Sequence, residues 1–207
     1  MDVFILILEL IGAAAFAVSG AMTGIRKNMD IFGACVLGLT VAVGGGITRD
    51  IILGAFPPAM FHDPIYAITA ILTCFIVFIP RIRTFLEGNS LLMLLADSIG
   101  LGIFTVSGAA RAFAVTTEAN VFLAVFVGVI TGVGGGLLRD MMAGDPPYIF
   151  VKHIYATAAI AGALLFCFLR TIAPQHIAML SGAILIVVIR LLASHYRWSL
   201  PKPGHRS

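Results

Sequence analysis

Residues 43–50 read VGGGITRD, and residues 133–140 repeat this pattern as VGGGLLRD. Each copy lies in a long apolar run and is followed by a further glycine and then by two consecutive prolines. Three glycines in a row each cost an α-helix about 1 kcal/mol relative to alanine, and charged residues at membrane depth are also expensive. We therefore expect the fold to be built around the two copies.

The composition is that of an integral membrane protein. Of the 207 residues, 60% are hydrophobic and only 11% are charged, and the mean hydropathy is +1.06. A soluble domain is about half apolar and about a quarter charged. The net charge of +3 is modest and comes largely from the connections and the tail, so no nucleic-acid partner is expected.

Seven apolar runs are candidates for membrane-spanning helices, which need about 20 mainly apolar residues. Short connections that contain proline, glycine or charged residues separate them, and a short basic tail occupies residues 195–207. The sequence thus predicts an all-α polytopic membrane protein that forms a single domain over residues 1–207. The expected spans are residues 3–25, 31–55, 64–80, 91–113, 119–144, 153–170 and 175–194.

The similarity between the two halves extends beyond the glycine motifs. Matched pairs are Glu9 and Asp97, Ser19 and Ser107, and Tyr66 and Tyr155. Residues of about 3–80 and about 91–170 therefore form one three-span unit that is used twice, and the run at about 175–194 is left over. Because each unit has an odd number of spans, the second copy enters the membrane in the opposite orientation, which is the inverted-repeat plan.

Basic residues predict the orientation of the chain. Seven spans place the two termini on opposite sides, and basic residues gather on the cytoplasmic side of a membrane. The side of the C-terminus holds Arg26, Lys27, Arg81, Arg83, Lys152, Arg190, Arg197, Lys202 and Arg206, whereas the other side holds, outside the two motifs, Arg111 and Arg170. We expect the N-terminus outside and the C-terminus in the cytoplasm.

The two glycine triplets fall near the middle of the second span of each unit. Their residues are Gly44, Gly45, Gly46, Gly134, Gly135 and Gly136. Matching breaks in two helices are the best sequence pointer to a permeation or binding site, and carbonyls at the end of a half-helix attract cations. The alternative is that the glycines only allow close helix packing, as small residues commonly do in membranes. We favour a functional break.

The charged residues at membrane depth divide between the two sides. Adjacent residues on a helix do not face each other, so we expect each motif arginine to pair with an acid on another helix. The expected ion pairs are Glu9 with Arg49 and Asp97 with Arg139, and the other two acids, Asp50 and Asp140, would cap backbone groups or face water.

Four carboxylates stand against two arginines in this network, and an acidic excess along a polar path favours cations. The alternative is that all these charges fix the register of the helices, as buried ion pairs often do. The hydroxyls of Ser19 and Ser107 are candidates for a pore lining, although membrane serines more often bond backbone groups.

No enzymatic signature appears. The sequence has no nucleophile elbow, phosphate loop or zinc ligand set, and the glycine triplets lack the strand–helix context of a dinucleotide site. We expect no catalytic residues, no cofactor and no resident metal.

Two three-span units, a glycine triplet in each second span, a seventh span and an outside N-terminus together resemble the trimeric intracellular cation (TRIC) channel family. The Gly-Gly-Gly-x-x-Arg-Asp motif followed by glycine and two prolines is similar to the prokaryotic branch, some members of which are described as putative glycine transporters. The resemblance covers nearly the whole chain. It implies a homotrimer in membrane lipids, with a pore in each protomer at the kinks of the second and fifth spans.

The resemblance also implies passive conduction of K⁺ and Na⁺ in the plasma membrane of a prokaryote. A small amino-acid carrier, specifically for glycine, that binds its substrate at the same broken helices is the first alternative. A non-conducting protein that binds lipid or supports assembly is the second.

Overall fold

The computed structural model describes residues 3–116, 120–151 and 154–198, and this part of the chain is helical apart from short connections. Its ten helices are α1 (Val3–Arg26), α2 (Ile31–Ile52), α3 (Ala59–His62), α4 (Ile65–Phe78), α5 (Pro80–Glu87), α6 (Ser90–Val115), α7 (Val121–Met142), α8 (Tyr148–Val151), α9 (Ala156–Leu169) and α10 (Gln175–His195). The predicted all-helical membrane class is confirmed.

One of the longer helices lies in each of the seven predicted runs. Five of them, α1, α2, α6, α7 and α10, are long and apolar enough to cross a membrane. Helix α4 bends by 86° into α5, and the two together make a sixth candidate. Helix α9 has 14 residues, which is about 21 Å at 1.5 Å per residue and shorter than a hydrocarbon core of about 30 Å.

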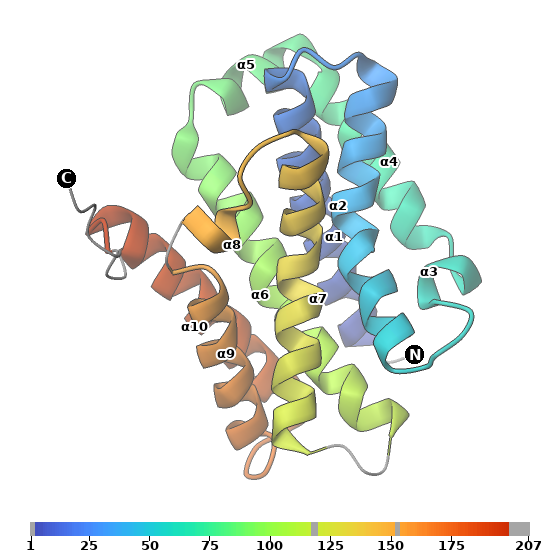
Figure 1. The fold of residues 1–207 in the computed structure, drawn as a ribbon, viewed down its shortest axis with the longest axis vertical. Coiled ribbons are helices and arrows are strands. Elements are labelled where there is room, and N and C mark those ends of the chain that lie inside the picture. Colours follow the sequence, from blue (N-terminus) through green and yellow to red (C-terminus); the bar gives the residue numbers. More distant parts are fainter. Residues whose placement is uncertain (1–2, 117–119, 152–153, 199–207) are drawn as a thin grey trace, which may run out of the picture.

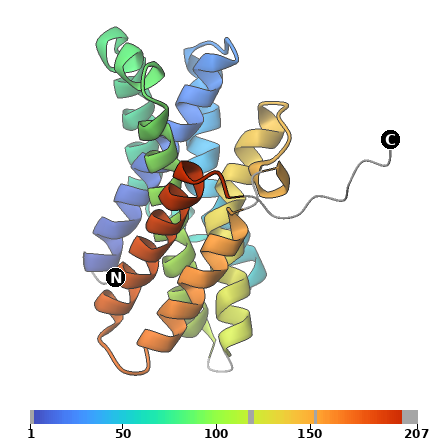
Figure 2. The same cartoon turned by 90° about the vertical axis from the view of Figure 1, so that its left-hand side faces the viewer.

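Four helices form the centre of the molecule (Figure 1). Helix α1 packs against α2 and α6, and α7 packs against the same two helices. Helix α4 lies against α1 and α2, and α9 lies against α6 and α7. Helix α10 packs against α9 and α6, and Figure 2 shows α9 and α10 side by side on one flank.

Helices α2 and α7 run in opposite directions in Figure 1. The end of α7 therefore lies near the start of α2, where Lys27 Nζ is 2.5 Å from Asp145 Oδ1 on the surface. As a result, the Arg-Asp motif at the end of α2 and that at the end of α7 lie at opposite ends of the molecule.

The same local chemistry begins and ends α2 and α7. Asp30 and Asn120 are the N-caps, and each side chain accepts a hydrogen bond from the amide three residues later, at 2.7 and 2.9 Å. This bond satisfies one of the free amides of the first turn. Gly54 and Gly144, with φ of +66° and +70°, follow the last turns in the left-handed conformation that glycine adopts without strain.

The glycine triplets do not interrupt their helices, so the predicted breaks are wrong. Helices α2 and α7 continue through both triplets, and the triplets face each other where the two helices cross. A β-carbon at Gly45 would overlap the carbonyl oxygen of Thr131, and one at Gly135 would overlap that of Val41. The glycines allow two backbones to touch, which is the packing alternative.

Two phenylalanines stack where α1 meets α6. The rings of Phe16 and Phe104 lie 5.4 Å apart with 17° between their planes, and both are buried. A β-carbon at Gly12 would lie 3.2 Å from Phe104, and one at Gly100 would overlap Phe16. Matching residues of the two halves therefore face each other in the core.

The outward faces of the helices are apolar. Phe32 near the start of α2 is 76% exposed, and the matching Phe122 near the start of α7 is 79% exposed. Many other large apolar side chains are exposed on the same helices. A surface this apolar is unusual for a soluble monomer and suits contact with lipid.

Candidate functional site

One group of polar side chains lies at the end of α2, and we call Glu9, Arg49, Asp50 and Tyr66 the first charge cluster. Glu9 comes from α1 and Tyr66 from α4, and all four residues are buried. Arg49 Nη1 lies 3.5 Å from Glu9 Oε1, and the Tyr66 hydroxyl donates to Glu9 Oε2 at 2.7 Å. The expected ion pair between Glu9 and Arg49 is therefore present.

Asp50 joins the end of α2 to the following connection. Its Oδ1 accepts from Nε of the adjacent Arg49 at 2.8 Å, and its Oδ2 accepts from the backbone amide of Ala59 at 2.8 Å. The carboxylate thus caps the start of α3, as expected. The expectation that neighbouring residues stay apart is wrong here, because the long arginine side chain reaches around the helix to the carboxylate.

A second group lies at the end of α7. We call it the second charge cluster, and its members are Asp97, Arg139, Asp140, Ser19, Tyr155 and Arg190. Arg139 Nη1 lies 2.5 Å from Asp97 Oδ1 and donates to Ser19 Oγ at 2.6 Å. The structure therefore brings together the second expected ion pair and adds a contact from α1.

Asp140 repeats the arrangement of Asp50. Its Oδ1 accepts from Arg139 Nε at 2.8 Å, and its Oδ2 accepts from the backbone amide of Tyr148 at 2.7 Å. The carboxylate thereby caps the start of α8. The guanidinium of Arg139 also lies over the ring of Tyr148, 5.4 Å from its centroid.

The two clusters differ at the acid of the first helix in each half. Asp97 is one methylene shorter than Glu9, and no hydrogen bond joins it to Tyr155 in the described part of the chain. Instead, Arg190 Nη2 of α10 lies 3.2 Å from Asp97 Oδ2. The Arg190 guanidinium also stacks on the Tyr155 ring, 4.7 Å from its centroid.

Arg190 lies in the protein interior, so the prediction that it is one of the basic residues that report orientation is wrong. The residue is only 5% exposed. A sequence signal existed, since Arg190 follows Ile186 and Ala183 at helical spacing in the buried stripe of α10. The charge count at membrane depth is therefore four carboxylates against three arginines.

The two candidate serines have different surroundings. Ser19 accepts the hydrogen bond from Arg139. Ser107 is 2% exposed, and its hydroxyl has no hydrogen-bond partner among the residues that the structure describes. Because Ser107 matches Ser19 in the repeat, the Arg139–Ser19 contact has no equivalent in the first charge cluster.

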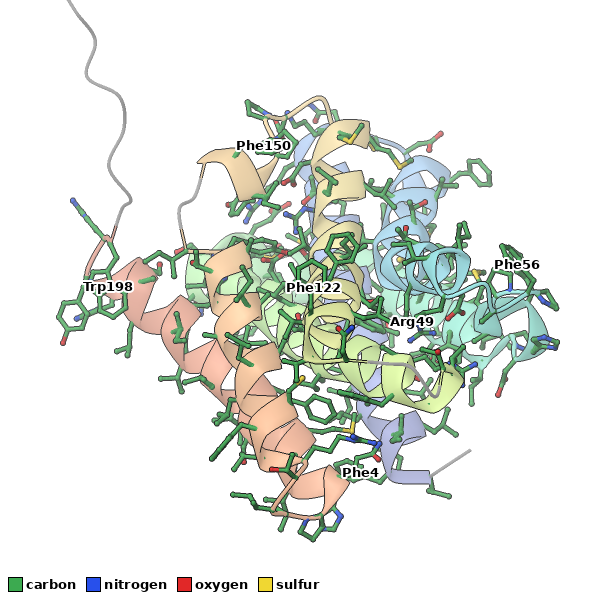
Figure 3. All side chains as sticks on the ribbon, turned by 60° about the horizontal axis from the view of Figure 1, so that its bottom comes forward. Phe4, Arg49, Phe56, Phe122, Phe150 and Trp198 are labelled. Carbon is green, nitrogen blue, oxygen red and sulfur yellow. The ribbon has the colours of Figure 1, made fainter. Side chains whose placement is uncertain are left out.

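A small cavity, partly open to the exterior, adjoins the first charge cluster. Its lining combines charged, polar and apolar residues: Glu9, Ala42, Val43, Gly46, Ile47, Arg49, Asp50, Ala59, Met60, Tyr66 and Phe104. Figure 3 shows Arg49 among the helices, whereas Phe56 and Trp198 lie at the periphery. Of the two triplets, Gly46 is the residue that faces this cavity.

Some basic residues used to predict the orientation lie outside the described residues, namely Lys152, Lys202 and Arg206. Most of the expected tail, from residue 199, also lies outside them. The orientation of the termini stays a prediction.

The chain matches a known protein family over two segments. The family model described as glycine transporter matches residues 6–81 and residues 94–171. The Escherichia coli K12 protein called UPF0126 inner membrane protein YadS is 37% identical over 202 residues, which are 95% of this chain and 93% of that protein.

Solved structures of cation channels have the same fold. A TRIC cation channel solved to explain conductance is 38% identical, with a TM-score of 0.85 over 97% of this chain and 98% of that one. The TRIC trimeric intracellular cation channel orthologue from Rhodobacter sphaeroides is 34% identical, with a TM-score of 0.84 over 96% of this chain and all of the other.

Proposed function

Since the chain belongs to the prokaryotic branch of the TRIC family, which includes the proteins described as glycine transporters and UPF0126 membrane proteins, we propose that it is a passive channel for monovalent cations. The permeant ions are K⁺ and Na⁺. The relatives named above are an inner membrane protein and cation channels, which supports a place in the plasma membrane of a prokaryote.

The observation that carries this proposal is the cavity beside the first charge cluster. It is lined by the carboxylates Glu9 and Asp50 and by the single cation Arg49. Rings and pockets with an excess of carboxylate favour cations over anions in a membrane pathway. A cavity whose charged lining residues are net acidic, set among lipid-facing helices, suits cation permeation.

The path of the ion runs through each protomer along the crossing of α2 and α7. The continuous helices remove half-helix carbonyl ends from the mechanism. Their place is taken by side chains and by the open face of Gly46, which borders the cavity. The buried hydroxyl of Ser107 on α6, which has no hydrogen-bond partner among the described residues, offers an oxygen atom to a dehydrated cation, whereas that of Ser19 on α1 already accepts from Arg139.

The architecture belongs to the same proposal. We assign seven spans, two inverted three-span units over residues of about 3–80 and about 91–170, and a seventh helix at about 175–194. The reciprocal contacts Gly45–Thr131 and Gly135–Val41 and the two matched family segments support the repeat. The N-terminus lies outside and the C-terminus in the cytoplasm, in agreement with the positive-inside rule.

The chain works as a homotrimer surrounded by lipid. The Rhodobacter sphaeroides orthologue is a trimeric channel, and the broad apolar outer surface of this chain provides area for contacts with other protomers and with lipid.

A glycine carrier is the second candidate, and a specific feature favours it. The same cavity is lined by both an arginine and two carboxylates, which suit the carboxylate and the ammonium of a zwitterion. The family model described as glycine transporter points the same way. A carrier of this kind needs an occluded site, whereas a channel needs a continuous wet path.

The deciding experiment measures current through the purified protein in a planar bilayer under a KCl gradient, with glycine then added to one side. Discrete unitary currents that reverse near the K⁺ equilibrium potential and ignore glycine support the channel. A silent bilayer together with saturable uptake of labelled glycine into liposomes supports the carrier and rejects the channel.

A pair of variants tests the role of the cavity. Glu9→Gln removes a carboxylate from its lining, and Glu87→Gln removes one from an exposed surface pair with Arg83. The ratio of cation to anion permeability is expected to fall for Glu9→Gln and to stay unchanged for Glu87→Gln. Equal ratios for both variants would remove the first charge cluster from the ion path.

A further inference from the structure

Helix α10 is the one long helix that the repeated units leave over, and small residues hold it against its neighbours. A β-carbon at Gly182 would lie 2.8 Å from the carbonyl oxygen of Gly162 in α9. A β-carbon at Gly102 in α6 would lie 2.9 Å from the carbonyl oxygen of Ala183. These backbone contacts fix both the depth and the rotation of α10 against α6 and α9.

The fixed rotation of α10 directs Arg190 into the second charge cluster. Arg190 follows Ala183 by seven residues, which is about two helical turns, so both lie on the same face. Its guanidinium contacts Asp97 at 3.2 Å and the Tyr155 ring at 4.7 Å. Placed there, it adds a positive charge to the interior that has no counterpart in the repeat.

The two clusters consequently differ in formal charge. The first has two carboxylates, Glu9 and Asp50, and one arginine, so it carries −1. The second has two carboxylates, Asp97 and Asp140, but two arginines, so it is neutral. Within the described residues, Arg49 is the one basic residue that forms an ion pair with Glu9.

We propose that Arg190 makes conduction asymmetric, because it neutralises the cluster at the end of α7 while the cluster at the end of α2 stays anionic. This inference rests on the proposed channel function and goes beyond it by giving α10 a role in permeation. A fixed negative charge raises the local concentration of cations at one mouth, so cations enter more readily at the first charge cluster. One unit charge at roughly 10 Å in water changes that concentration about two-fold.

The test is the current–voltage relation of single channels in symmetric KCl. Each channel is compared with itself at opposite voltages, so the direction in which it inserts into the bilayer need not be known. At about 20 mM KCl the Debye length is about 20 Å, and the wild-type currents at opposite voltages are expected to differ by about two-fold. At about 1 M KCl the Debye length is about 3 Å, and the difference between the two currents is expected to vanish.

The Arg190→Gln variant gives both clusters a charge of −1, so its low-salt currents are expected to be symmetric. Arg190→Lys keeps the charge and the asymmetry. The double variant Asp97→Asn with Arg190→Gln restores a neutral second cluster and is expected to regain the asymmetry. Arg197→Gln, which removes an exposed cation at the same end of α10, is the matched control and leaves the wild-type ratio unchanged.

Two results would overturn the inference while the channel function stands. One is a conducting wild type with symmetric currents at low salt, which needs no variant to fold. The other is an Arg190→Gln channel that keeps the wild-type asymmetry. A wild type that carries no current but takes up labelled glycine into liposomes rejects the proposed function itself, and the inference with it.

Discussion

Gly45 of α2 lies directly against the backbone carbonyl of Thr131 in α7, with no room for a side chain between them. The reverse contact joins Gly135 to the carbonyl of Val41. In each half the contacted carbonyl belongs to the residue four positions before the middle glycine of its own triplet. The crossing of α2 and α7 is therefore reciprocal and is made largely of backbone.

This crossing predicts opposite effects for two neighbouring glycines. Gly45→Ala inserts a methyl group against a backbone atom and is expected to lower the free energy of unfolding by about 1–3 kcal/mol. Gly46→Ala is the control, because its β-carbon meets only Arg49 Nη2, at 4.0 Å, and helix propensity favours alanine. Thermal unfolding followed by circular dichroism in detergent compares them, and equal melting temperatures would refute the backbone contact.

The open face of Gly46 predicts an effect on current rather than on folding. Gly46→Val places a side chain in the cavity beside the first charge cluster and is expected to reduce the unitary K⁺ current several-fold while the melting temperature stays near that of the wild type. Gly88→Val, in an exposed connection, is the control for the added bulk. An unchanged current in Gly46→Val would place the ion path elsewhere.

The two matched tyrosines, Tyr66 and Tyr155, are expected to lose different amounts of free energy of unfolding when each is replaced by phenylalanine. Tyr66→Phe removes the 2.7 Å bond to Glu9 and is expected to cost about 1 kcal/mol, since interhelical bonds in membranes average about 0.6 kcal/mol and a charged acceptor strengthens them. Tyr155→Phe removes a hydroxyl that has no hydrogen-bond partner in the described part of the chain and is expected to cost less. Chemical denaturation measures both, and a larger cost for Tyr155→Phe would contradict the asymmetry of the clusters.

The arginines of the two motifs also differ in what their loss leaves behind. Among the described residues, Arg49→Gln leaves Glu9 and Asp50 without a cation, whereas Arg139→Gln leaves Asp97 paired with Arg190. Loss of one partner from a buried ion pair lowers the free energy of unfolding by about 3–5 kcal/mol. We expect the loss for Arg49→Gln at the upper end of this range and a smaller loss for Arg139→Gln.

Lys27→Gln is the control for these arginine variants. It breaks an ion pair whose side chains are 38% and 44% exposed, and such pairs contribute at most about 1 kcal/mol. The melting temperatures of the three variants are compared in one detergent. If Arg139→Gln proves the more damaging of the two arginine variants, the contribution of Arg190 is refuted.

Much of this fold follows from the sequence because its strongest signals are local and occur twice. Apolar run length located the long helices, and the repeat located the pairs Glu9–Arg49 and Asp97–Arg139. Pairing could be inferred because each acid and its arginine lie at the same end of neighbouring spans.

Three features differ from what the sequence predicts, and side-chain reach or tertiary packing explains each of them. The cost of the glycine triplets suggested a broken helix, but close contact between α2 and α7 offsets that cost without a break. The bond between Arg49 and Asp50 depends on side-chain reach rather than on helical spacing. Helical spacing places Arg190 on one face with Ala183 and Ile186, but the burial of that face depends on the rotation of α10, which the glycine contacts with α6 and α9 determine.

The backbone contacts at the crossing also have a mechanical consequence. Side chains absorb small displacements between helices by changing rotamer, but Gly45 and Gly135 have no side chains. Helices α2 and α7 therefore act as rigid bodies in contact at one point. Rotation about this pivot changes the separation of the helices at both ends of the molecule at once. A movement at the end that carries Arg49 is thereby coupled to a movement at the end that carries Arg139.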